Sequence, residues 1–303
     1  MQFHPPNDKE QSFEHCFGIS KLSRVAGETP AKSGPRGYPS SKAAGTSSFV
    51  KSVQAKTMHS FLSKLKRSFN IHRLTGCRWR AASVREDDKF RINGLERRVR
   101  GPASLSMLLE IVCDDVYGIK QCSELGAVID IGANIGVFCL HVHSLFPKAQ
   151  IVALEPSKNN RKFLIENVSD IATVYPFAIA ESDGIGRLAV DGDNTAYSLS
   201  GASSVGKTEQ VNTVTLETLI SKLGGGCVQL LKTDCEGGEY AIFRSPALRQ
   251  VSRIVGELHT CDAGEPESGL AQLRERGFWI EKWHPFPDGR AGIVWASQKK
   301  PSR

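Results

Sequence analysis

The sequence of 303 residues lacks the features that mark membrane-spanning and secreted proteins. No apolar run approaches the roughly 18 to 20 residues that a membrane helix needs, and the amino-terminal region has no secretory core. The eight cysteines include no CxxC pair, which disfavours a zinc site or a disulfide framework. We therefore expect a cytoplasmic protein with reduced thiols and no membrane span.

Acidic residues are absent between Glu28 and Glu86, where twelve basic residues occur. Residues 1–100 contain 20 basic and 8 acidic residues, whereas residues 101–303 contain 19 and 24. The first part is also rich in Ser, Gly and Pro, a composition that cannot offset the entropy of ordering. Residues 1–57 are therefore predicted to form a disordered basic leader, whose role in organelle targeting is left open.

Residues 58–89 are predicted to form a basic amphipathic helix and a linker. Apolar side chains recur at helical spacing from Met58 to Phe69, with Lys64, Lys66 and Arg67 between them. Three interpretations remain open: a helix packed on the edge of the domain, a membrane-surface or targeting element, and a nucleic-acid arm.

Residues 90–303 alternate short apolar runs with helical stretches, the pattern of an α/β protein. The spacing predicts about seven strands in one domain, with helices between them. The expected strands are 127–131, 150–154, 172–177, 227–233, 252–258, 278–283 and 292–296. Parallel sheets bind ligands at the carboxyl ends of their strands, so the site is expected there.

The segment VIDIGANIG, residues 128–136, joins a predicted strand to a predicted helix. Gly132 and Gly136 are expected to let the backbone approach a ligand closely, and Asn134 tolerates a left-handed conformation. The segment departs from the GxGxxG of nicotinamide-binding loops, because residue 134 is not glycine. The loop therefore favours a nucleoside over a dinucleotide.

Two acidic residues end the first two predicted strands. Glu155 is placed to accept hydrogen bonds from both hydroxyls of a ribose. If the ligand is S-adenosylmethionine, Asp130 can offset the positive amino group of its methionine part, directly or through water.

A second constellation, LLKTDCEGGEYAIF at residues 230–243, places four charged residues at a strand-to-helix junction. Lys232 in a buried strand needs a partner, and Asp234 is nearest by spacing. Glu239 falls in the first helical turn, which favours a carboxylate without a functional role. Asp234 and Glu236 lie in the loop and are better candidates for contacting a substrate or a cation.

Together with ALEP at 153–156, VTLETLI at 214–220 and ELH at 257–259, these motifs resemble the FkbM-type methyltransferases. The resemblance covers about residues 90–298. It implies a class I, Rossmann-like methyltransferase fold with a seven-stranded, mostly parallel sheet flanked by helices. It also implies S-adenosylmethionine as the methyl donor and O-methylation of a hydroxyl on a sugar, polyketide or similar metabolite. Its signature carries over to Asp130, Gly132, Asn134, Gly136 and Glu155 for the donor, and to Lys232, Asp234, Glu236, Glu239, Glu257 and His259 for the rest.

His259 is the first candidate for the base that activates the acceptor hydroxyl, since imidazole titrates near neutrality. Mg²⁺ held by Asp234, Glu236 and Glu257 is a less favoured alternative, and no metal is assigned. Two other functions compete: a nicotinamide-dependent oxidoreductase, and an RNA methyltransferase that uses the basic leader. The acidic folded part disfavours nucleic acid as a partner.

Overall fold

The computed structural model describes residues 66–75, 89–190 and 207–298. The predicted leader at 1–57 and much of the predicted linker lie outside these residues. Among the described residues, no helix is both long and apolar enough to cross a membrane.

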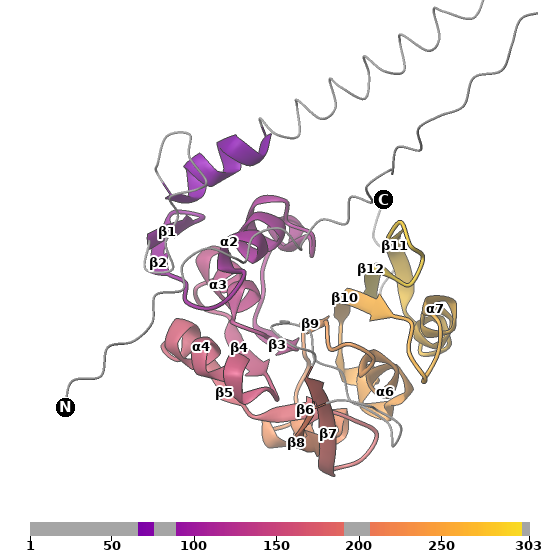
Figure 1. The fold of residues 1–303 in the computed structure, drawn as a ribbon. Helices are drawn as coiled ribbons and strands as arrows, with labels where there is room; N and C mark the ends of the chain where they lie inside the picture. Colours follow the sequence, from indigo (N-terminus) through magenta and orange to yellow (C-terminus); the bar gives the residue numbers. More distant parts are fainter. Residues whose placement is uncertain (1–65, 76–88, 191–206, 299–303) are drawn as a thin grey trace, which may run out of the picture. The chain divides into compact units, whose positions relative to one another are not determined.

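A seven-stranded sheet forms the centre of the domain, in the order β11-β12-β10-β9-β3-β4-β5 (Figure 1). Strands β5, β4, β3, β9 and β10 are parallel, and β12 runs antiparallel to β10 and β11. Their bounds are β3 Ala127–Ile131, β4 Gln150–Leu154, β5 Ala172–Tyr175, β9 Leu230–Thr233, β10 Arg253–His259, β11 Trp279–Pro285 and β12 Ala291–Ser297. The chain order reverses beside β3, so the carboxyl ends of β3 and β9 border the ligand position of such folds.

Helices cover both faces of this sheet. One hydrophobic cluster joins α3 Val137–Leu145, α4 Lys158–Val168 and the π-helix η2 Leu108–Cys113 to one face. The other joins α5 Leu216–Lys222, α6 Glu239–Arg244 and α7 Pro266–Glu275 to the opposite face. Alternate residues of β3 supply the two clusters, with Val128 in the first and Ile129 in the second, as the two-residue period of a strand requires.

The expected strand at 172–177 is divided by Pro176. Strand β5 ends at Tyr175, and Phe177 begins β6 Phe177–Ile179 in a separate three-stranded sheet. Proline has no amide hydrogen to donate to a ladder, which accounts for the break. The separate sheet also contains β7 Gly184–Val190 and β8 Lys207–Val214, which the sequence did not predict.

Short elements complete the described chain. The hairpin β1 Lys89–Ile92 and β2 Leu95–Arg98 is antiparallel and buries Phe90 and Ile92. The remaining short elements are α2 Ser104–Met107, η3 Ile119–Gln121 and η4 Pro246–Gln250.

Residues 66–75 are helical, so the helix extends beyond Phe69, where it was expected to end. Ile71 and Leu74 are buried in the hydrophobic cluster of η2 and α3, whereas Phe69 is 64% exposed. Lys66 forms a 2.8 Å ion pair with Asp114. The described part of the helix therefore packs on the domain, and all three interpretations of the whole segment stay predictions.

Candidate active site

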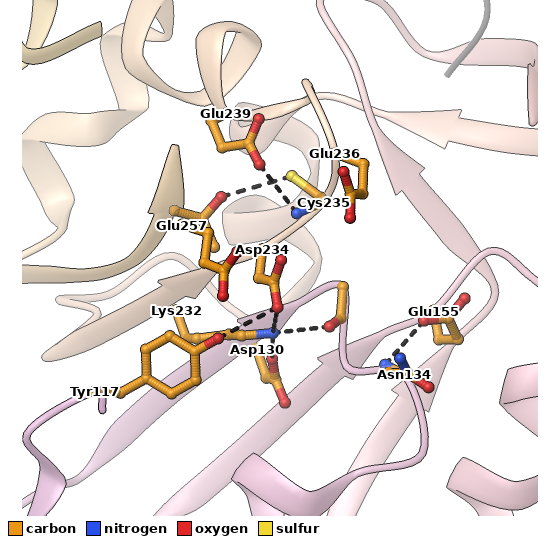
Figure 2. Close-up of polar contacts among 12 residues, drawn as sticks. Tyr117, Asp130, Asn134, Glu155, Lys232, Asp234, Cys235, Glu236, Glu239 and Glu257 are labelled. Atoms are coloured by element: carbon orange, nitrogen blue, oxygen red, sulfur yellow. Dashed lines mark hydrogen bonds and ion pairs between the residues drawn. The ribbon is translucent and has the colours of Figure 1, made fainter. Parts of the chain in front are cut away.

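A cavity of about 240 Å³ opens at the carboxyl ends of β3, β4 and β9. The β3–α3 loop, the end of β4, the loop after β9 and the π-helix η2 all contribute to its walls. Figure 2 shows Asn134 and Glu155 together, and apart from them the carboxyl groups of Asp234, Glu236 and Glu257. Part of each predicted set thus borders one cavity: Gly132, Asn134 and Glu155 of the donor set, and Lys232, Asp234, Glu236 and Glu257 of the second set. The cavity lining does not include Asp130, Gly136, Glu239 or His259.

The β3–α3 loop packs closely against other parts of the protein at both of its glycines. A Cβ at Gly132 would lie 1.8 Å from the carbonyl oxygen of Asp234, and one at Gly136 would lie 2.7 Å from Val168. Gly132 lines the cavity, but close packing against the protein itself requires both glycines. Internal packing therefore explains both glycines without a ligand, and the close approach of a ligand to them stays a prediction.

Glu155 is almost fully buried and receives two backbone hydrogen bonds. The Asn134 amide donates to Oε2 at 2.8 Å, and the Ser157 amide donates to Oε1 at 2.9 Å. Asn134 adopts the left-handed conformation expected of it, with φ of 52°, which aims its amide at this carboxylate. Burial raises the pKa of Glu155 to about 7, and the two amides only partly oppose that rise.

The Lys232 side chain lies between the β3–α3 loop and the loop after β9. Its Nζ donates to the Gly132 carbonyl at 2.7 Å and lies 3.1 Å from Asp130 Oδ1 and 3.7 Å from Asp234 Oδ2. The register pairs Asp130 with Lys232 on neighbouring strands, so Asp130 rather than Asp234 is the closer partner.

Asp130 is fully buried, and Cys139 Sγ donates to its other oxygen at 3.2 Å. Asp130 pairs with Lys232 and does not line the cavity, whereas Lys232 does; the expected contact of Asp130 to a methionine amino group, directly or through water, stays a prediction.

The loop after β9 is stabilised by Glu239, the first residue of α6. Its carboxylate accepts hydrogen bonds from the amides of Cys235, at 3.1 Å, and Gly237, at 2.7 Å. Glu236 has a φ of 52°, a conformation that side chains other than Gly and Asn rarely adopt. Burial raises the pKa of Glu236, His259 opposes the rise, and Asp234 and Glu239 reinforce it. The fold thus holds Glu236 in a strained position at the cavity wall.

His259 ends β10 between three carboxylates. Its Nδ1 lies 3.0 Å from Glu239 Oε1, and its Nε2 lies 3.3 Å from Glu257 Oε2 and 3.6 Å from Glu236 Oε2. Burial lowers the pKa of His259, but hydrogen bonds to Glu239 and Glu257 outweigh burial and raise it to about 11. A ring that stays protonated cannot accept a proton at neutral pH, which argues against His259 as the base; its role stays a prediction.

Comparison with known proteins identifies the family. Residues 130–278 match the family described as the methyltransferase FkbM domain. This chain contains an FkbM methyltransferase domain. The FkbM domain and the sheet topology together identify an S-adenosylmethionine-dependent methyltransferase with the class I fold.

Two curated proteins and one solved structure illustrate the similarity. The 31-O-demethyl-FK506 methyltransferase FkbM of Streptomyces tacrolimicus is 28% identical, over 56% of this chain and 80% of that protein. Methyltransferase 1 of Beauveria bassiana is 26% identical, over 58% of this chain and 81% of that protein. Fibrillarin of Aeropyrum pernix, solved with natively bound S-adenosyl-L-methionine, is 14% identical with a TM-score of 0.39, over 71% of this chain and 85% of that one.

Two cavity residues missed by the sequence reasoning precede the matched FkbM segment. Glu110 lies in the π-helix η2, and partial burial, with the charges of Glu257 and Asp234, raises its pKa. Tyr117 is buried, packs edge-on against Phe138 and donates to Asp234 Oδ2 at 3.2 Å. A lone acid within the apolar run LSMLLEIVC was the available signal for Glu110, since π-helical turns often occur at functional sites.

Asp234, Glu257 and His259 each bring one potential ligand atom within 4.8 Å of the others in the FkbM domain. This group differs from the expected set of Asp234, Glu236 and Glu257, because His259 takes the place of Glu236. A protonated imidazole has no lone pair for a metal, so the ring must first lose its proton before the group can bind an ion.

Proposed function

We propose that this protein transfers the methyl group of S-adenosylmethionine to a hydroxyl oxygen of a small-molecule acceptor, such as a sugar or polyketide metabolite. The single observation that supports the proposal is the shared cavity. It is lined by the buried carboxyl group of Glu155, which suits a ribose, and by the acidic side chains of Asp234, Glu236 and Glu257. The Streptomyces relative is named for a substrate whose oxygen lacks a methyl group, which supports oxygen as the acceptor atom.

The residues of the β3–α3 loop suit the methyl donor. Glu155 lines the cavity while almost fully buried, and a ribose can donate its hydroxyls to such a carboxylate without the charge repulsion that a phosphate would meet. Ala133 and Asn134 line the same wall and would hold the nucleoside. When bound, S-adenosylmethionine supplies an electrophilic methyl group on a positively charged sulfur.

The wall formed by the loop after β9 suits the acceptor. Glu236 is the preferred proton acceptor, because it lines the cavity and its raised pKa brings its basicity closer to that of an effective base at neutral pH. Asp234 accepts a hydrogen bond from the Tyr117 hydroxyl and lies near Lys232. Because these contacts stabilise its ionised form, it is assigned to orienting the acceptor rather than to accepting the proton. His259 is assigned no direct contact with the methyl group or with the acceptor oxygen.

Positioning supplies the largest part of the expected rate enhancement. Holding the acceptor oxygen in line with the methyl group contributes roughly 7 to 11 kcal/mol, whereas a general base contributes about 10²- to 10⁴-fold. The Glu236→Gln variant should therefore reduce turnover by about 10²-fold or more and leave the affinity for S-adenosylmethionine unchanged.

The test is transfer of labelled methyl groups from S-adenosylmethionine to a pool of hydroxylated small molecules. Parallel reactions contain RNA, and calorimetric titrations compare S-adenosylmethionine with NADH. Glu267→Gln, on the exposed side of α7, is the matched control for Glu236→Gln. Labelled RNA without labelled small molecules, or binding of NADH in place of S-adenosylmethionine, would overturn the proposal.

A further inference from the structure

The placement of the His259 side chain is not explained by a role as catalytic base or by the pairing of β10. Its backbone carbonyl accepts a 2.9 Å hydrogen bond from the Tyr240 hydroxyl, and β10 is paired on both sides by β9 and β12. The ring is therefore held at a fixed point behind the acidic wall of the cavity.

Both ring nitrogens face carboxylate oxygens. The carboxylate of Glu239 is completely buried and accepts from two loop amides as well as lying 3.0 Å from Nδ1. On the other side, Nε2 faces Glu257 and Glu236, and an Asp234 oxygen lies within 4.8 Å. A neutral ring would direct one lone pair at a carboxylate oxygen, so this geometry favours a ring that donates from both nitrogens.

The carboxylates that meet at His259 belong to different segments. Glu236 lies in the loop after β9, Glu239 begins α6 and Glu257 lies on β10, while Glu236 and Glu257 also line the cavity. Without an internal cation, these carboxylates would repel one another and turn outward to solvent.

We propose that His259 is a positioning residue, whose ring holds Glu236 and Glu257 in the orientation that places the acceptor while Glu239 anchors the ring to the loop backbone. This inference rests on the proposed methyl transfer, since it assigns the acceptor wall to that reaction. His259 touches no reacting atom and acts through the two cavity carboxylates.

The first test compares the wild-type protein with two variants and needs no acceptor. In ¹⁵N-histidine-labelled protein, NMR should show both nitrogens of the His259 ring protonated at pH 8, and Glu239→Gln should move the ring's titration to lower pH. His259→Gln identifies the signal by its loss. A neutral His259 ring at pH 7 would overturn the proposal.

The second test separates positioning from structural support. His259→Gln should raise the KM for the acceptor found in the methyl-transfer screen by roughly tenfold or more, because two charge-assisted contacts lose their orientation. Its affinity for S-adenosylmethionine should stay within about twofold of wild type. His284→Gln, an exposed histidine on β11, is the matched control.

The two proposals fail in different ways. A wild-type protein that binds no S-adenosylmethionine refutes the methyltransferase proposal itself. A wild-type protein that binds the donor and methylates an acceptor, beside a His259→Gln variant with unchanged acceptor KM, refutes only the positioning role.

Discussion

Replacing Glu155 by Gln tests the nucleoside end of the site through protein stability as well as binding. In the folded protein, burial raises the pKa of this carboxyl from 4.5 to about 7. A raised pKa means that the folded state disfavours the ionised form, so stability is retained below pH 4.5 and lost as pH rises toward 7. At 1.36 kcal/mol per pKa unit, the ionised carboxyl costs about 3 kcal/mol above pH 7.

The Glu155→Gln variant cannot ionise at this position, so it should lack this pH dependence. The introduced amide side chain offers one acceptor oxygen to two amide donors, which lowers the variant's stability by an amount that does not depend on pH. The diagnostic quantity is therefore the difference in free energy of unfolding between wild type and variant. Measured by urea denaturation without ligand, that difference should shift by about 3 kcal/mol in favour of the variant from pH 4.5 to 8.

The affinity for the ligand should depend on pH in the opposite direction to the stability of the wild-type protein. Ribose hydroxyls donate to the ionised carboxylate, so wild-type affinity for S-adenosylhomocysteine should rise as pH increases from 6 to 8. The Glu155→Gln variant should bind more weakly at pH 8 and show no such rise. Glu267→Gln should match wild type in both assays. A stability difference that stays flat with pH, together with unchanged affinity, would refute the assignment of Glu155.

Three further changes probe the acidic wall. Glu236→Gly should change stability by less than about 1 kcal/mol in urea denaturation while turnover falls, because relief of the φ of 52° offsets the greater unfolded-state entropy of glycine; a loss of several kcal/mol would contradict the strain. Tyr117→Phe should keep its packing on Phe138 but reduce turnover by roughly tenfold, since Asp234 loses a hydrogen bond; full activity would show that this bond is dispensable. EDTA should leave methyl transfer unchanged, because His259 already provides a cation where an ion would bind; activity lost to EDTA and restored by Mg²⁺ would assign that role to a metal instead.

Local sequence was sufficient to predict the elements whose hydrophobic pattern is strong. Strands β3 and β4 have the predicted bounds, and α4 begins after Ser157, whose hydroxyl accepts from the Asn160 amide as a helix cap should. The FkbM signature also identified the family and the fold. In these places residues close in sequence determine the structure by themselves.

The sequence was less informative where residues distant in sequence determine the chemistry. The protonation of His259 depends on carboxylates from three segments, none of which fixes the ring alone. The need for glycine at position 132 comes from the Asp234 carbonyl, about a hundred residues later in the chain. Glu110 and Tyr117 reach the cavity only through tertiary packing, beyond the reach of a local pattern.

Direct contacts join the two loops of the site into one unit. The Asp234 amide donates to the Ile131 carbonyl at 3.1 Å, the Lys232 ammonium donates to the Gly132 carbonyl, and Gly132 packs directly on Asp234. A shift of either loop would break contacts to the other, since the packing at Gly132 leaves no room for a side chain. Methyl transfer requires close alignment of donor and acceptor, and a rigid contact between the two loops at Gly132 and Lys232 would serve that requirement.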